Sequence, residues 1–138
     1  MRTITLIVLA AMLPANAPAA TCVGADPAIT SVKVANVSAN GSLNLYTLVG
    51  TVTNLGSQRQ ASNVLQFVDI YTNGQRVNDR GIPPLAPGQS HTFSYVWQRS
   101  TDAGNNTTRM RFSLRFVQPS PPGSQDCNLA NDSATIRF

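Results

Sequence analysis

The middle of the chain reads VTNLGS (52–57), NVLQFVDIYTNGQRV (63–77), LAPGQS (85–90) and HTFSYVW (91–97), and this stretch decides the fold. Runs rich in Val, Ile, Phe, Tyr and Thr alternate with Gly, Pro and Asn turns, which is typical of strands in a small sandwich. Asn73-Gly74 predicts a hairpin because both residues tolerate a positive φ, with a short edge strand over Gln75–Val77 after it. Three prolines in GIPPLAPGQS remove ladder donors, so we expect a crossover loop pinned to the core by Ile82 and Leu85.

Further alternating segments lie on both sides of this stretch. The segments that we expect to be strands are Ala28–Val37, Leu43–Asn54, Arg109–Val117 and Ser133–Phe138. Alternate residues of a strand share a face, so Met110, Phe112, Leu114 and Phe116 should face inward. Six or seven strands and no convincing helix predict an all-β chain, namely an immunoglobulin-like antiparallel β-sandwich of about seven strands.

The N-terminus has the pattern of an export signal. A basic start at Arg2 precedes an apolar run over Ile4–Leu13, and Ala17-Pro18-Ala19 fits the small-x-small rule for cleavage. The apolar run is shorter than the roughly 20 residues that span a bilayer. We therefore expect a signal peptide over residues 1–19, one domain over residues 20–138, and a periplasmic or secreted protein. Loss of Arg2 would lower the formal charge from +4 to +3.

The two cysteines, Cys22 and Cys127, are expected to form a disulfide, as an even pair in an exported protein does. The first and last strands of immunoglobulin-like sandwiches often run side by side in parallel, which would place both cysteines at one end. Lipidation of Cys22 is an alternative, but Thr21 is a poor residue before a lipidated cysteine. A redox or metal pair would need closer spacing or more ligands.

The ordered set of turn signals resembles the CARDB family, the cell-adhesion-related domain found in bacteria. The matching pieces are Val52-Thr53-Asn54-Leu55-Gly56, Asn73-Gly74, Ile82–Gly88, Trp97 and the Asx-rich stretch Asp126–Ala134. The resemblance implies an immunoglobulin-like or fibronectin type III-like fold in extracellular binding or scaffolding, and it carries no catalytic residues. The chain differs from the family pattern in lacking a Glu near the final Asn cluster, in its expected disulfide and in standing as one domain.

Catalytic chemistry finds little support in the sequence. His91 is the single histidine, and no nucleophile motif accompanies it. Asp69 lies inside an apolar strand, where a hydrogen-bonded structural acid is the simpler interpretation. We therefore expect no enzyme and no cofactor. A calcium site at Asp126, Asn128, Asn131 and Asp132 is a weak alternative to an ordinary Asx turn, since oxygen ligands at short spacing suit Ca²⁺.

The outward residues Arg109, Arg111 and Arg115 form a row that could meet an anionic partner, although a solvated strand face gives the same pattern. No aromatic residues are evident between these arginines, and only Tyr46 and Tyr71 are candidate platforms for sugar stacking.

The sequence thus predicts an exported, non-catalytic module for binding, adhesion or scaffolding in the bacterial cell envelope or exterior. Its partner would be an envelope or extracellular protein or an anionic polysaccharide, and not nucleic acid; the oligomeric state is left open. One alternative is a structural subunit or periplasmic assembly factor that pairs through strand edges. A secreted hydrolase or inhibitor is a weaker one.

Overall fold

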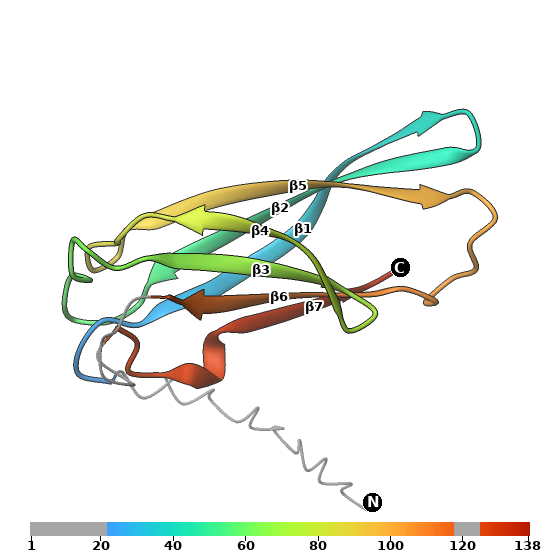
Figure 1. Cartoon of the computed structure of the whole chain (residues 1–138). Helices are drawn as coiled ribbons and strands as arrows, with labels where there is room; N and C mark the ends of the chain where they lie inside the picture. Colours follow the sequence, from blue (N-terminus) through green and yellow to red (C-terminus); the bar gives the residue numbers. More distant parts are fainter. Residues whose placement is uncertain (1–21, 118–124) are drawn as a thin grey trace, which may run out of the picture.

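The computed structural model describes residues 22–117 and 125–138, and these residues form a two-layer β-sandwich (Figure 1). The expected signal peptide lies outside the described residues. One sheet has the strand order β1-β2-β5 and the other β4-β3-β6-β7, all neighbours being antiparallel. The elements are β1 (Pro27–Asn40), β2 (Leu43–Asn54), β3 (Gln66–Thr72), β4 (Gln75–Ile82), β5 (Ser90–Ser100), β6 (Arg109–Phe116), the 3-10 turn η1 (Leu129–Asn131) and β7 (Ser133–Arg137).

The core lies between the inner faces of the two sheets, and the expected alternation produces it. On β6, Met110 and Phe112 are fully buried and Leu114 nearly so, while Arg109 is exposed. Ile82 and Leu85 are also buried, which confirms that the proline-rich loop is pinned to the core. The other buried apolar residues of the cluster are Ile29, Leu48, Val52, Val68, Ile70 and Phe93.

The Asn73-Gly74 hairpin is confirmed, with φ values of 48° and 83° at the two turn residues. The edge strand after it is longer than expected, because β4 pairs with β3 as far as Ile82 and the prolines interrupt only the residues beyond. Leu129–Asn131 forms a short 3-10 turn where no helical element was expected.

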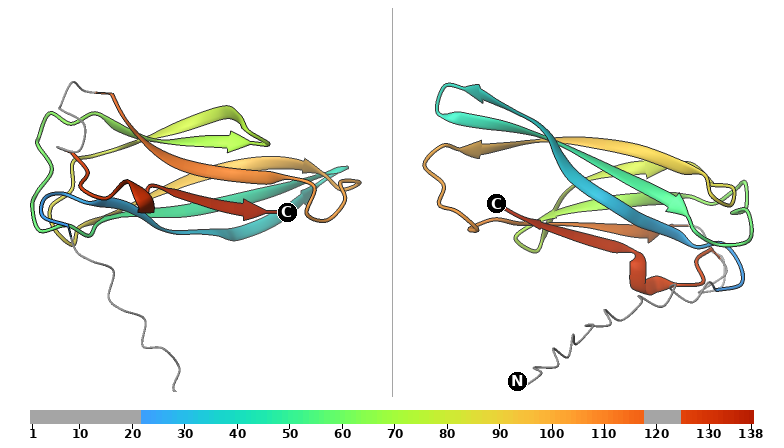
Figure 2. Two further views of the ribbon diagram at one scale, coloured as in Figure 1. Left: turned by 90° about the horizontal axis from the view of Figure 1, so that it is seen from below. Right: turned by 180° about the vertical axis from the view of Figure 1, so that it is seen from behind.

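The first and last strands lie side by side and run in the same direction, as expected, although they belong to different sheets. Strand β1 is an edge of the three-stranded sheet and β7 an edge of the four-stranded sheet, so the two run alongside each other across the sandwich (Figure 2). Because both strands run in the same direction, the cysteines that precede them lie at one end of the sandwich, as expected.

The β1–β2 hairpin extends beyond the sandwich, and β1 reaches Asn40 where the sequence had suggested Val37 (Figures 1 and 2). Val34 and Val37, which pair with Leu48 and Tyr46, are 39% and 49% exposed on β1, an edge strand of its sheet. Register shifts at Thr30 and Ala35 put two bulges into β1, an edge strand. No helix among the described residues is long and apolar enough to cross a membrane.

Candidate functional site

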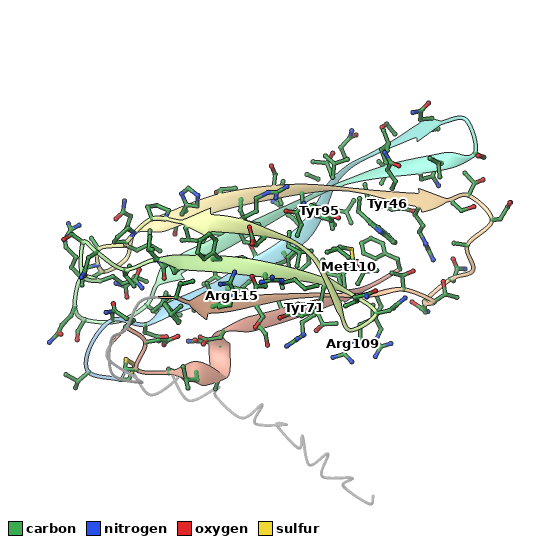
Figure 3. The ribbon with its side chains drawn as sticks, viewed as in Figure 1. Tyr46, Tyr71, Tyr95, Arg109, Met110 and Arg115 are labelled. Atoms are coloured by element: carbon green, nitrogen blue, oxygen red, sulfur yellow. A yellow bond between two sulfur atoms is a disulfide. The ribbon has the colours of Figure 1, made fainter. Side chains whose placement is uncertain are left out.

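Two regions outside the apolar core concentrate polar chemistry. One is the end of the sandwich that carries both cysteines, which we call the disulfide end. The other is the outer face of the four-stranded sheet. Figure 3 shows residues of this outer face, among them Tyr71, Arg109 and Arg115.

Asn54, at the last position of β2, organises the disulfide end. Its side chain is completely buried, and its Oδ1 accepts hydrogen bonds from the backbone N–H groups of Asp26 and Gly56, both at 2.9 Å. Its Nδ2 donates to the carbonyls of Gln58 and Leu85, also at 2.9 Å. One amide group therefore ties the start of β1 to two loops. Asn54 belongs to the Val52–Gly56 segment that resembles the CARDB pattern, and its role is to hold the fold.

The Gly of the same segment has an equally structural role. A Cβ on Gly56 would overlap the carbonyl oxygen of Gly24 and approach the backbone nitrogen of Asp26 to 2.6 Å. Only glycine lets the two backbones lie this close. The hydrogen bond from the Leu55 N–H to the Asp26 carbonyl, 2.7 Å long, closes the same contact.

The chain joins Cys22 to Cys127 by a disulfide at this end, with 5.7 Å between their Cα atoms. The Cys127 N–H donates to the carbonyl of Ala25 at 2.9 Å. The segment before β1 and the segment before η1 are thereby fixed to each other both covalently and through the backbone.

The expected calcium-ligand set does not act as one group. The Asn128 Oδ1 caps η1 by accepting from the Ala130 N–H at 3.1 Å, which is the role of an ordinary Asx turn. The Asp126 Oδ1 accepts from the Asn128 N–H at 2.9 Å. Asp26, which sequence spacing had not suggested, joins from 105 residues away by accepting from Asn131 Nδ2 at 3.0 Å.

The carboxyl groups of Asp126 and Asp132, which we call the acidic pair, lie within hydrogen-bonding distance of each other. Burial raises the pKa of both groups, and for Asp132 the hydrogen bond with Asp126 and the negative charges of Asp126 and Asp26 raise the pKa further, to about 8. Two carboxylates in contact cannot both ionise without cost, so near neutral pH the pair shares a proton.

This shared proton predicts that stability falls with rising pH. The pKa of Asp132 is about 8 in the folded protein and near 3.9 in the unfolded chain, so only the folded state keeps the proton between these values. The stabilisation is complete below about pH 4 and lost as pH rises through 8. In EDTA, we expect the free energy of unfolding in urea to be lower at pH 9 than at pH 5 by about 2 kcal/mol, a value reduced for solvent screening of the half-buried Asp132. Asp132→Asn should remove this difference; equal pH profiles for the variant and the parent would contradict it.

On the outer face of the four-stranded sheet, Arg115 is bound to carboxylates of its own chain. Its Nε and Nη2 donate to the two oxygens of Asp69 at 2.7 and 2.9 Å, and its Nη2 lies 3.6 Å from Asp79. The hydrogen bond to Asp69 also raises the pKa of Arg115. Asp69 is 3% exposed and fully engaged, which agrees with the structural interpretation of this acid. Arg115 also stacks on the Phe67 ring at 4.9 Å.

The other arginines of this face form a group around Tyr71. The Arg111 guanidinium lies 4.3 Å from the centre of the Tyr71 ring, and Arg109 pairs directly with Arg137 across β6 and β7. Arg76 enters from β4, 3.7 Å from Asp69. We call Arg76, Arg109, Arg111 and Arg137 the arginine patch. Aromatic rings do accompany these arginines, contrary to expectation, because β3 places them beside β6.

The remaining candidate residues lie elsewhere. Tyr46 packs between Trp97 and Phe138, with ring centres 5.5 and 5.1 Å apart, so it belongs to an aromatic cluster and is no open sugar platform. His91 lies at the start of β5 opposite Val52, and its ring has no hydrogen bond among the described residues.

Comparison with known proteins agrees with this architecture. Among curated proteins, none matches this chain. A crystal structure of a CARDB domain from Pyrococcus furiosus, in complex with di-metal ions, is similar with a TM-score of 0.55 and 20% sequence identity, over 84% of this chain and 88% of that one. At this identity the likeness establishes the fold alone. The CARDB family model matches residues 25–113, well over half of the sequence, and the chain therefore belongs to the CARDB family.

Proposed function

We propose that this protein is an exported binding module that holds an anionic polysaccharide of the bacterial cell envelope or exterior on its arginine patch. The N-terminal signal pattern and the disulfide support export. Membership of a cell-adhesion-related family supports binding as the mode of action. Catalysis has no comparable support. The His91 ring has no hydrogen-bond partner among the described residues, and the Asp69 carboxylate is bound by Arg115.

The unbalanced charge of one sheet face carries the proposal. Arg76, Arg109, Arg111, Arg115 and Arg137 lie on it with only Asp69 and Asp79 among the described residues, so five positive charges meet two negative ones and leave +3. Arg109 and Arg137 face each other directly across the strands. Like charges in this position destabilise a sheet, and a fold that keeps such a pair is expected to gain from it elsewhere.

The shape of the patch favours a polysaccharide over a protein. The patch crosses all four strands of the sheet, a width of about 14 Å at the usual strand spacing. Protein partners are usually held by aromatic or aliphatic anchors in a desolvated pocket, whereas the Tyr71 ring is already covered by Arg111. A row of guanidinium groups instead matches the carboxylates that repeat along a polysaccharide. Each guanidinium group can bind one carboxylate through two hydrogen bonds.

Strand-edge pairing, the alternative from the sequence, is less well supported. Two bulges interrupt β1, Val77 makes a bulge in β4, and β7 is only five residues long. On the β5 edge, the Ser94 carbonyl already accepts a hydrogen bond from Arg80 Nε at 2.8 Å. Such edges resist the addition of another strand.

The test is binding of the mature protein to polygalacturonate, a carboxylate polymer, with neutral dextran and polyphosphate as comparison ligands. We expect binding to polygalacturonate at about 50 mM salt that weakens steeply by about 300 mM. The double variant Arg109→Ser/Arg137→Ser should bind at least about tenfold more weakly, without loss of stability because it removes a like-charge pair. The matched control is Lys33→Ser/Arg59→Ser, which also removes two exposed charges but outside this face.

If both double variants lose the same affinity for polygalacturonate, the effect is due to net charge alone, and the arginine patch is not the binding site. Stronger binding to polyphosphate would reassign the ligand to a phosphate polymer. If the protein binds neither polymer and instead crosslinks to one acidic protein through the patch, the proposal of a polysaccharide ligand is wrong.

A further inference from the structure

Asn-Gly dipeptides stand at the turns of both tight hairpins of the sandwich. Asn40-Gly41 lies where β1 turns into β2, and Asn73-Gly74 joins β3 to β4. Both asparagines and both glycines are exposed, and a Cβ built on either glycine would meet nothing within 4 Å. Dipeptide sequence and accessibility therefore do not distinguish one asparagine from the other.

An asparagine followed by glycine can react with its own backbone. The amide nitrogen of the glycine loses its proton and attacks the side-chain carbonyl carbon of the asparagine. A C–N bond forms and the side-chain nitrogen leaves as ammonia, which closes a five-membered succinimide ring. Water then opens this ring at either carbonyl and leaves aspartate or isoaspartate. Glycine favours the reaction because it has no side chain to obstruct the attack and it permits the backbone rotation that ring closure needs.

Hydrogen bonds distinguish the two sites. Asn73 is held by Arg109 of the neighbouring strand β6, because Asn73 Oδ1 accepts from the Arg109 N–H at 2.9 Å and the Asn73 N–H donates to the Arg109 carbonyl at 2.8 Å. The side-chain carbonyl and the backbone of Asn73 must both turn before Gly74 can attack, and these bonds resist that turning. The side chain of Asn40 makes no hydrogen bond within the described part of the chain, so its amide can rotate toward Gly41.

We propose that Asn40 is a site of spontaneous deamidation in the folded protein and that the two hydrogen bonds to Arg109 protect Asn73. The reaction turns a neutral amide into a carboxylate, which lowers the formal charge expected for the mature chain from +3 to +2. Lys33 is the only charged residue of β1 and β2, so the formal charge of this hairpin falls to zero. The isoaspartate product also adds one methylene to the backbone beside the Asn40–Leu43 pair.

The two positions differ in what a new carboxylate would do. The β1–β2 hairpin extends beyond the sandwich, so the change at Asn40 leaves the core intact (Figures 1 and 2). Asn73 instead contacts the backbone of Arg109 in the arginine patch, where a negative charge would weaken the attraction for an anionic ligand. The reaction at Asn40 is independent of polysaccharide binding, because β1 and β2 belong to the other sheet.

The test is peptide mapping of the full mature chain, with its disulfide intact, during incubation at about pH 8.5. Trypsin separates the two sites, because cleavage after Lys33, Arg59 and Arg76 gives the peptides 34–59 and 60–76. Tandem mass spectrometry then locates the conversion within each peptide. We expect Asn40 to be converted at least about tenfold faster than Asn73, the factor by which hydrogen bonds of ordinary strength slow a step that must break them.

The unfolded chain is the control for the neighbouring sequence. In concentrated urea with the disulfide reduced, both asparagines should react at similar rates, because the hydrogen bonds to Arg109 are lost. The same preference for Asn40 in urea would assign the selectivity to local sequence and overturn the protection. Conversion of Asn73 as fast as Asn40 in the folded protein, or no conversion of Asn40, would also overturn the proposal.

A variant provides a second readout on the intact protein. Deamidation at Asn40 should give an early acidic form that ion exchange resolves from the parent. Asn40→Gln should abolish this form, since a glutamine would have to close a larger ring, and should keep the melting temperature of the parent. Formation of the same acidic form by Asn40→Gln at the parent's rate would place the reaction elsewhere and overturn the assignment to Asn40.

Discussion

Replacing Asn54 by alanine is expected to lower the free energy of unfolding by about 3–5 kcal/mol, a large share of the total stability of an ordinary domain. The alanine removes four hydrogen bonds and leaves the N–H groups of Asp26 and Gly56 without their acceptor. A buried donor without a partner costs about 1–3 kcal/mol. The cavity left in a fully buried site adds to this. Urea denaturation followed by Trp97 fluorescence measures the loss.

Asn44→Ala is the matched control, because Asn44 lies on the same strand and its side chain makes no hydrogen bond among the described residues. Its expected cost is below about 1 kcal/mol. Asn54→Asp should be at least as damaging as alanine, since a carboxylate would face the carbonyls of Gln58 and Leu85 in place of a donor. If Asn54→Ala unfolds within about 1 kcal/mol of the parent, water replaces the amide and Asn54 is not the organising residue.

The predicted effect also explains why a short phrase can mark this family of folds. Asn54 and Gly56 touch no candidate ligand surface; they join the β1 start to two loops. Leu85, in the proline-rich loop, is fully buried, and its carbonyl accepts a hydrogen bond from the Asn54 amide. The motif residues therefore meet in space and hold one end of the sandwich. Such a motif identifies the fold and leaves the ligand unspecified.

Local patterns were sufficient for the strands and turns. Alternation placed Met110, Phe112 and Leu114 inside, and the hairpin residues Asn73-Gly74 adopt the positive φ values that their chemistry allows. These features depend on neighbours in sequence or on the period of a strand. The length of β4 was missed, because a polar edge strand has no apolar alternation to reveal it.

The candidate sites could be predicted only in part, because they depend on strand register. Arg115 looked like a free surface charge until the register brought Asp69 beside it, 46 residues away. Arg76 and Arg137 join the arginine patch only through β4 and β7. Asp26 reaches Asn131 across 105 residues. None of these partners has a signal in local spacing, so composition could suggest a basic face but not its members.

Removing the disulfide is the second large expected effect, at about 3–5 kcal/mol. The bridge joins residues 105 apart in sequence, and closing so long a loop greatly restricts the unfolded chain. In the double variant Cys22→Ser/Cys127→Ser, we expect this loss in urea denaturation with little change in the native strands, because the Cys127 N–H still bonds to Ala25. Dithiothreitol should destabilise the parent to the same extent and leave the double variant unchanged.

The disulfide experiment also separates two ways in which this end could be held together. If the bridge acts only on the unfolded chain, its loss and the loss of Asn54 should add, since neither changes the native contacts of the other. If the bridge also positions the start of β1, the Asp26–Asn54 hydrogen bond is already weakened without it, and the combined variant should lose less than the sum. The direct backbone bond between Ala25 and Cys127 favours additivity. An unchanged stability without the bridge, or two free thiols found by mass spectrometry in protein expressed in the periplasm, would contradict a stabilising disulfide altogether.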